Sequence, residues 1–472
     1  MLTPLKAIAR HSEKPTVNTY LSLRRFGISS TRLLALTLAV TSVLTAPLPA
    51  WSADREVLDL VWLETKANAA GTRSNDLVAI EHFEIPLSKL EADVAERIPA
   101  DVRDSLIFEK DGQKHVRWII NPEDSLWYKD VEKWLKSQGL STQRHKHFNA
   151  YMTASRSYII EDPVTKAQFS AKVSTNQTGG AWKDKKQPID DAAQVRMAND
   201  FIDSELKKAP LQHAIVMDEP AMFGIKSVDQ AMLVRTLAEL TEKKTFYIPG
   251  FAAVHHKAGA AIAKKNGSNN PAAFWNEHYN KPLARALAEA AARFGLTYDS
   301  PHSQNFLVEL DENMKPTGKI VLRDIGDSYA SEDFFKAKKM GSFLNRWEPD
   351  NIVKGGLSMA VGVLHGNEFP SWMSEAEYMR WGNQFYEEFE KTFSSMTGIP
   401  KSELNDQMWV SGRYFSKTYQ THTPGWKNFL AQQSPGAVSA PPASAVPDTL
   451  AGHFTPSKAL LDRKCQQIMR SI

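Results

Sequence analysis

Apolar residues recur at approximately helical spacing in several stretches of the chain, for example at Val195, Phe201 and Leu206. Cap residues mark where some of these stretches begin: Ser374 opens one capping box and Ser227 opens another. A long stretch starts at an Asn-Pro pair and stops at Gly295, which suits a helix C-terminus. The predicted helices are residues 190–208, 227–244, 270–295 and 374–396.

Shorter stretches carry the pattern of β-strands. Residues 156–160 and 168–174 flank a turn that contains Asp162-Pro163, so they predict a β-hairpin. Residues 305–310 and 319–324 flank a polar turn and predict a second hairpin. A short buried strand is expected at residues 213–217.

This mixed order of helices and hairpins predicts an α+β fold with mixed or antiparallel sheets and flanking helices. We expect two lobes, residues 54–210 and 211–432, with a central cleft between them. Residues 433–450 are rich in Pro, Ala and Ser, which predicts a flexible linker to a short tail at residues 451–472. Residues 1–53 form a leader.

Composition narrows the class of protein. The chain has 472 residues, of which 42% are hydrophobic and 24% charged, so wholesale disorder is excluded. Its single cysteine, Cys465, excludes an internal disulfide scaffold and a cysteine-based zinc cluster. The net charge of +3 gives no indication of nucleic-acid binding.

The positive charge is concentrated in the leader, whose six basic residues and one acidic residue give it +5. Subtracting this from +3 leaves about −2 for residues 54–472. Arg24, Arg25 and Arg32 precede an uncharged apolar core, and small residues follow it at Ala50-Trp-Ser-Ala53. This order is typical of a secretory signal peptide and predicts export to the periplasm. An uncleaved anchor in the inner membrane is the alternative.

A group of polar residues marks the second hairpin. His302 and Asn305 stand just before its first strand, and Arg323 and Asp324 end its second strand. Because the two ends of a hairpin meet, we expect these side chains to converge. Asn and Asp supply the oxygen ligands that Mg²⁺ prefers, and His and Arg supply donors to phosphate oxygens. The group favours a nucleotide site over a capped turn with a surface ion pair.

These motifs resemble those of the aerobactin-type siderophore synthetases, the NRPS-independent IucA/IucC family. His302-x-Gln-Asn305 is similar to the family's His-x-Gln-Asn motif, and Leu322-Arg-Asp324 to its following Leu-Arg-Asp strand. Upstream, Ala154-Ser-Arg-Ser157 resembles a Ser-x-Arg-Thr element. Lys172-Val-Ser and Thr178–Lys183 resemble the strand and loop that follow it.

The resemblance implies an enzyme that uses ATP to adenylate a carboxylate, often citrate, and then joins it to an amine or alcohol. The expected partners are thus a polycarboxylate and an amine, with ATP and Mg²⁺ as cofactors; a homo-oligomer stays open. Residues implied as catalytic, through their charge near the phosphates, are His302, Lys172 and Arg156. Residues implied in cofactor binding are Ser157, Lys183 and Arg323. Residues implied in holding Mg²⁺ are Asn305 and Asp324.

Two other functions remain open. Asn305 before a hairpin and Asp324-Ile-Gly326 after it are also typical of a kinase-like phosphotransferase, although no glycine-rich loop precedes Lys172. An exported relative that binds a small molecule without turnover is the third possibility. It is favoured by departures from the family pattern, since Ala154 replaces Ser and Lys183 replaces Arg.

Overall fold

The computed structural model describes most of the body of the chain. The described ranges are residues 77–152, 157–177, 184–237, 240, 245–299, 301–326, 328–364, 369–411 and 413–434. The predicted leader and tail, and nearly all of the predicted linker, lie outside them. In these ranges no helix is both long and apolar enough to cross a membrane.

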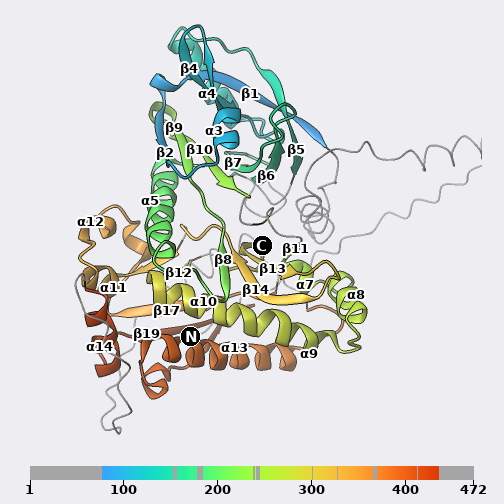
Figure 1. Cartoon of the computed structure of the whole chain (residues 1–472), viewed down its shortest axis with the longest axis vertical. Helices are drawn as coiled ribbons and strands as arrows, with labels where there is room; N and C mark the ends of the chain where they lie inside the picture. The colour runs from blue at the N-terminus through green and yellow to red at the C-terminus, as the bar shows by residue number, and fades with distance from the viewer. Residues whose placement is uncertain are drawn as a thin grey trace, which may run out of the picture. The chain divides into compact units, whose positions relative to one another are not determined.

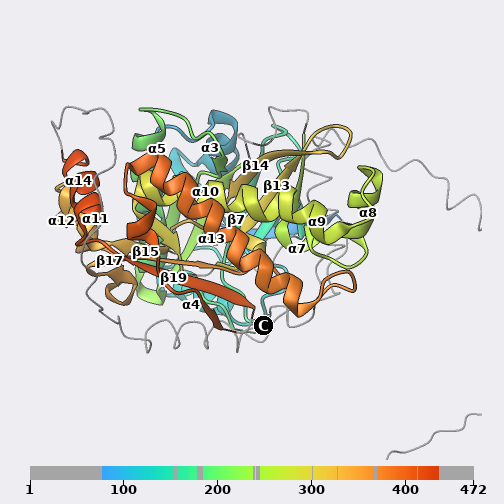
Figure 2. The same ribbon diagram turned by 90° about the horizontal axis from the view of Figure 1, so that it is seen from below.

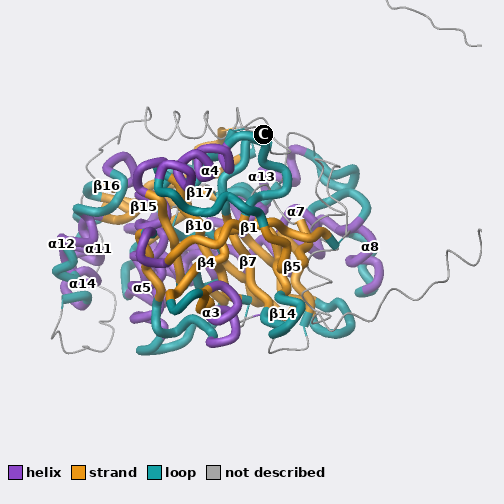
Figure 3. The backbone as a smooth tube through the Cα atoms, turned by 90° about the horizontal axis from the view of Figure 1, so that it is seen from above, coloured by secondary structure: helices purple, strands orange, loops and turns teal. Residues whose placement is uncertain are grey.

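The largest sheet of the described residues has nine strands, in the order β2-β9-β10-β7-β6-β5-β1-β4-β3. Figure 3 shows β1, β4, β5, β7 and β10 of this sheet. Its strands are β1 (Val78–Pro86), β2 (Glu91–Val94), β3 (Ile107–Lys110), β4 (Gln113–Ile119), β5 (His145–Met152), β6 (Ser157–Glu161), β7 (Gln168–Lys172), β9 (Ala221–Ile225) and β10 (Gln230–Thr236). Two helices accompany it, α3 (Ala100–Leu106) and α4 (Trp127–Ser137).

Three smaller sheets complete the strands of the described ranges. The four-stranded sheet, in the order β11-β13-β14-β8, contains β8 (Ala214–Val216), β11 (Phe246–Pro249), β13 (Phe306–Leu310) and β14 (Pro316–Leu322). One three-stranded sheet contains β12 (Leu296–Tyr298), β15 (Ser328–Ser331) and β16 (Ile352–Val353). The other contains β17 (Gly356–Val361), β18 (Trp409–Ser411) and β19 (Tyr414–Gln420). With the helices, these sheets confirm the predicted α+β class.

Helices α10 and α13 run side by side (Figures 1 and 2) and contribute to one large apolar core. The remaining described helices are α5 (Ile189–Leu206), α7 (Gly250–Ala253), α8 (Ala258–Lys265), α9 (Pro271–Trp275), α10 (Lys281–Phe294), α11 (Glu332–Ala337), α12 (Gly341–Leu344), α13 (Glu375–Thr397) and α14 (Pro424–Gln432).

Local signals explain where the predicted helices begin and end. Ser374 and Glu377 form the predicted capping box at the start of α13. The Asn270 side chain accepts a hydrogen bond from the backbone of Ala273 and caps α9, which continues into α10 through one π-helical turn. Gly295 ends α10 with φ +60°, a left-handed conformation that glycine adopts at little cost. The predictions for residues 190–208, 270–295 and 374–396 are confirmed.

The helix predicted from Ser227 is wrong over residues 229–237. Asp229 adopts φ +49° and turns the chain, and Gln230–Thr236 then forms β10, all seven residues of which are buried. This strand pairs with β9 on one side and β7 on the other. The Ala-Met-Leu-Val run suits a strand buried on both faces as well as a helix, and non-local pairing decides between them.

The predicted lobe boundary at residue 210 stays a prediction. Strands β9 and β10 come after residue 210 in the sequence, yet they pair into the sheet built from the earlier strands. The chain therefore enters the four-stranded sheet at β8, returns to the large sheet, and leaves it again toward β11.

Candidate functional site

Both predicted hairpins are present and position the candidate residues. Strands β6 and β7 pair antiparallel, and Lys172 at the end of β7 lies opposite Ser157 and Leu233. Strands β13 and β14 also pair antiparallel, so that Asp324 follows β14 directly after Arg323. Each hairpin thus ends at a charged residue that the sequence singled out.

The two hairpins meet through an ion cluster. Lys172 Nζ lies 3.5 Å from Oδ1 of Asp324. The Arg235 guanidinium, from β10, donates to the same carboxylate oxygen and also lies 2.8 Å from Oε1 of Glu219. Arg235 and Glu219 are almost fully buried, whereas Lys172 and Asp324 keep 16% and 22% of their side chains exposed. The exposed side of the cluster is therefore the Lys172–Asp324 pair.

The electrostatics of Asp324 follow from its neighbours. Burial alone would raise the pKa of this carboxyl, but the positive charges of Arg235, then Lys172 and Arg323, hold the pKa well below its usual range. Asp324 also has φ +59°, a left-handed conformation that is uncommon for a residue with a side chain. Its carboxylate is thus fixed in place and charged at neutral pH.

The hairpin base holds Asn305 and Arg323 by backbone contacts. The Arg323 amide donates to the carbonyl of Asn305 at 3.1 Å, and its Nε donates to the carbonyl of Gln304 at 2.9 Å. The Tyr298 hydroxyl donates to the carbonyl of Arg323 at 2.9 Å. Arg323 and Asn305 are both buried. Arg323 therefore braces the turn before β13 and adds positive charge beside Asp324.

The structure brings together Lys172, Arg323, Asp324 and the backbone of Asn305. His302 lies just before the short helix Ser303–Asn305, where its backbone bridges to Gly362. Arg156 and Lys183 lie outside the described residues, and so does the side chain of Ser157. The roles implied for these residues stay predictions.

Arg235 is the central residue that the sequence did not predict. It sits in the Met-Leu-Val-Arg-Thr run, where a lone arginine among buried apolar residues is itself a signal, because a fully buried charge needs a partner. The helix predicted for this stretch does not place Arg235 beside β7. Once the stretch is a strand beside β7, Arg235 lies opposite Ser170, and its side chain reaches the same Asp324 oxygen as Lys172.

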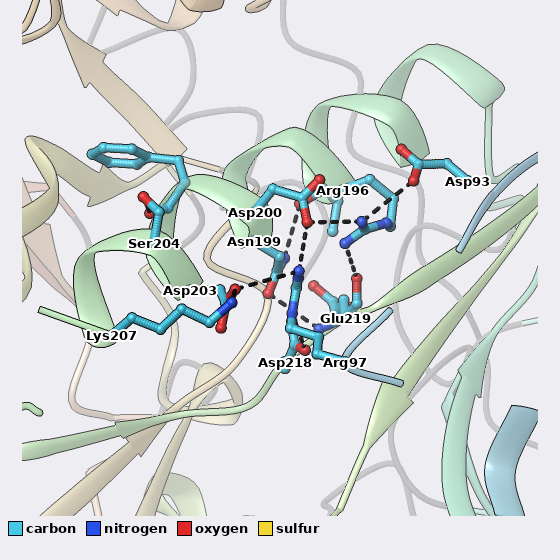
Figure 4. A network of polar contacts seen from close by, with 12 residues as sticks. Asp93, Arg97, Arg196, Asn199, Asp200, Asp203, Ser204, Lys207, Asp218 and Glu219 are labelled. Atoms are coloured by element: carbon cyan, nitrogen blue, oxygen red, sulfur yellow. Dashed lines mark hydrogen bonds and ion pairs between the residues drawn. The ribbon is translucent and has the colours of Figure 1, made fainter. Parts of the chain in front are cut away.

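A second network of polar contacts holds the backbone of Glu219 (Figure 4). The Arg196 guanidinium donates to the carbonyl of Glu219 at 2.9 Å, and the Asn199 side chain accepts from its amide at 3.1 Å. The Arg97 guanidinium bridges Asp218 and Asp200, with nitrogen–oxygen distances of 2.7 and 2.6 Å. This network fixes the segment between β8 and β9 to α5.

The metal prediction can be compared with this arrangement. Asp324 Oδ1 already receives two cationic side chains, and no group of three or more His, Cys, Asp or Glu in the described ranges is arranged to hold a metal. The cluster suits an anion better than a resident cation. We expect Mg²⁺ to enter with nucleotide phosphates, as it commonly does in ATP sites, so the ligand role of Asn305 and Asp324 stays a prediction.

No protein-family model and no curated protein matches the chain. The petrobactin biosynthesis protein AsbB from Bacillus anthracis is a similar solved structure, with 11% identity over 58% of this chain, 49% of that chain covered and a TM-score of 0.44. Two others are the aerobactin synthetases IucA, in its ATP-bound form, and IucC, from Klebsiella pneumoniae. Each is 12% identical with a TM-score of 0.44; the alignments cover 72% and 68% of this chain and 69% and 62% of theirs.

The chain therefore spans about half the length of AsbB and less than two thirds of IucC. The similar solved structures are siderophore-biosynthesis proteins, as the motifs predict, and the likeness is distant.

Proposed function

We propose that this protein is an ATP-dependent ligase that activates a carboxylate and condenses it with an amine or alcohol. The observation that carries the proposal is the partly exposed Lys172–Asp324 pair, which joins the ends of two hairpins and is backed by the buried Arg235. The His-x-Gln-Asn and Leu-Arg-Asp motifs lie on the second hairpin and support the same proposal.

The reaction has two steps. A carboxylate oxygen attacks the α-phosphorus of ATP, the bond to the β-phosphate oxygen breaks, and pyrophosphate leaves. An amine or hydroxyl then attacks the acyl carbon, loses its proton and displaces AMP. Negative charge builds on phosphate oxygens in the first step, so a preplaced cation lowers its barrier.

Lys172 is the group we assign to the phosphates. Its ammonium is partly exposed and is held by Asp324, which stays paired with Arg235 if Lys172 turns to a nucleotide. Asp324 would thus position Lys172 without leaving a buried carboxylate unpaired. Arg323 would raise the local positive potential while its side chain stays on the turn before β13.

Pyrophosphate release from Mg·ATP, assayed over a panel of polycarboxylates with amines, tests the proposal. Lys172→Ala is expected to lower the rate about 100-fold or more, the usual loss for a group that stabilises transition-state charge. His302→Ala tests the second motif. Lys136→Ala is the matched control, because Lys136 is an exposed lysine of α4 paired only with Glu132 among the described residues. A wild-type rate in both site variants would contradict the assignment.

One observation favours a second candidate, a small-molecule-binding protein without turnover. The Asp324 carboxylate is committed to Arg235 and Lys172 in the structure. Titration calorimetry with Mg·ATP and with citrate separates the two, because citrate binding without ATP binding supports only the second.

ADP in place of AMP as the product would instead indicate a kinase-like phosphotransferase. Fractionation of cells tests the proposed export to the periplasm.

A further inference from the structure

A separate cavity of about 590 Å³ lies outside the candidate site. Helix α5 forms one side of it, and the segment that contains α11 and α12 forms the other, with Gln433 after α14 at its edge. Figure 2 shows α11, α12 and α14 grouped together. Cavities of this volume are typical of small-molecule sites. The residues of the Lys172–Asp324 cluster are not among those that line it.

One wall of the cavity is aromatic and rigid. Phe201 and Phe343 meet edge to face, with ring centroids 5.6 Å apart. Phe343 is stacked with Phe335, at 4.2 Å, and with Trp347, at 5.0 Å. Because these rings are packed against one another, the wall is preformed. Only a small part of Phe201 (6%) and Phe343 (4%) is exposed, and Met197 and Met340 supply further apolar lining.

The acidic groups of the cavity are already neutralised. Glu205 Oε1 accepts from Lys208 at 2.7 Å and from Lys338 at 3.2 Å. Asp200 Oδ1 accepts from Arg97 at 2.6 Å and from Arg196 at 2.9 Å, and neither arginine lines the cavity (Figure 4). Each of these carboxylates therefore already pairs with two cationic side chains.

Positively charged residues outnumber negatively charged ones in the lining of the cavity. Lys208, Lys338 and Arg346 line the cavity together with the two acids. Within the part of the chain that the structure describes, no side-chain partner is found for the exposed Arg346 guanidinium. Lys338 is largely buried, and burial lowers its pKa in spite of Glu205, so a second anion near it would be favourable.

We propose that this cavity binds a small carboxylate with an aromatic or apolar body. The body would lie on the apolar lining that Met197, Met340, Phe201 and Phe343 form together. The carboxylate would accept from Arg346, whose planar fork matches the two oxygens, and from Lys208 or Lys338. The site does not depend on the proposed ligase function.

The test uses the full-length chain and 2-naphthoate as the probe, with binding measured by titration calorimetry. One probe per chain is expected to bind, and Arg346→Gln should weaken binding about tenfold or more, the usual loss of a charged hydrogen bond. Ser342→Trp, which fills the cavity from an exposed position, should abolish binding. The matched control is Lys391→Gln, an exposed lysine on α13.

Two further arms define the ligand class. The neutral isostere 2-naphthamide and inorganic phosphate should each bind at least tenfold more weakly than 2-naphthoate, because one lacks the charge and the other the apolar body. Lys172→Ala should leave 2-naphthoate binding unchanged. Undetectable binding by the wild type, equal binding of the amide, or full affinity in Arg346→Gln, each with folding verified by circular dichroism, would overturn the proposal.

Discussion

Replacing Arg235 should be among the most damaging single changes in the described structure. Its guanidinium is 5% exposed and neutralises Glu219, whose side chain is 2% exposed, as well as Asp324. Arg235→Met keeps much of the apolar volume but leaves the Glu219 carboxylate buried without a cation. Breaking a buried ion pair in this way costs about 3–5 kcal/mol. We therefore expect the free energy of unfolding to fall by that amount.

Urea denaturation of the single variants Arg235→Met and Glu219→Gln and of the double variant measures this cost. The double variant should lose less stability than the two single variants lose together, by about 2 kcal/mol or more, because it does not leave the Glu219 carboxylate buried without a cation. Arg103→Met is the control, because Arg103 is exposed and pairs with an exposed neighbour, so its loss should stay below about 1 kcal/mol. A loss for Arg235→Met no larger than the control's would refute the reasoning.

Three further predictions concern stability and are read from urea denaturation. Burial, with help from Arg117, lowers the pKa of His82 from 6.5 to about 3, and neither ring nitrogen has a hydrogen-bond partner among the described residues. Unfolding should therefore become easier by up to about 1.4 kcal/mol per pH unit below pH 6, and His82→Leu should remove that slope. Gly295→Ala would place a Cβ 2.3 Å from Phe334 and should cost about 2 kcal/mol more than Gly398→Ala, which has equal φ strain but open space. Ser374→Ala should cost about 1 kcal/mol by removing the cap of α13.

The sequence predicts those parts of the fold that are determined by residues close together in the chain. Helix α13 follows from its capping box and from Gly398, which ends it in a left-handed conformation. The β13–β14 hairpin follows from two apolar runs around a polar turn. Strand β10 cannot be predicted in this way, because it forms by pairing with β7 and β9. Local spacing of apolar residues does not encode such tertiary pairing.

The same division applies to the candidate site. Asp324 ends a predicted strand, and Lys172 was located by the family resemblance, which also implied one site for both. Sequence reasoning did not reveal that Arg235 from a third element joins them. The long sequence separation, 89 residues for Arg235–Asp324, explains why.

Lowering the pH affects the Asp324 cluster and the region around His82 in different pH ranges. The pKa of Asp324 is lowered in the fold, so its ion pairs stabilise the protein above the unfolded pKa of about 3.9, and this contribution is lost only as pH falls below that value. His82 acts in the opposite window: the unfolded chain takes up its proton below about pH 6.5 while the folded chain resists it down to about pH 3. At pH 5 the protein should therefore lose stability through the β1–β5 region while the Asp324 carboxylate keeps its charge.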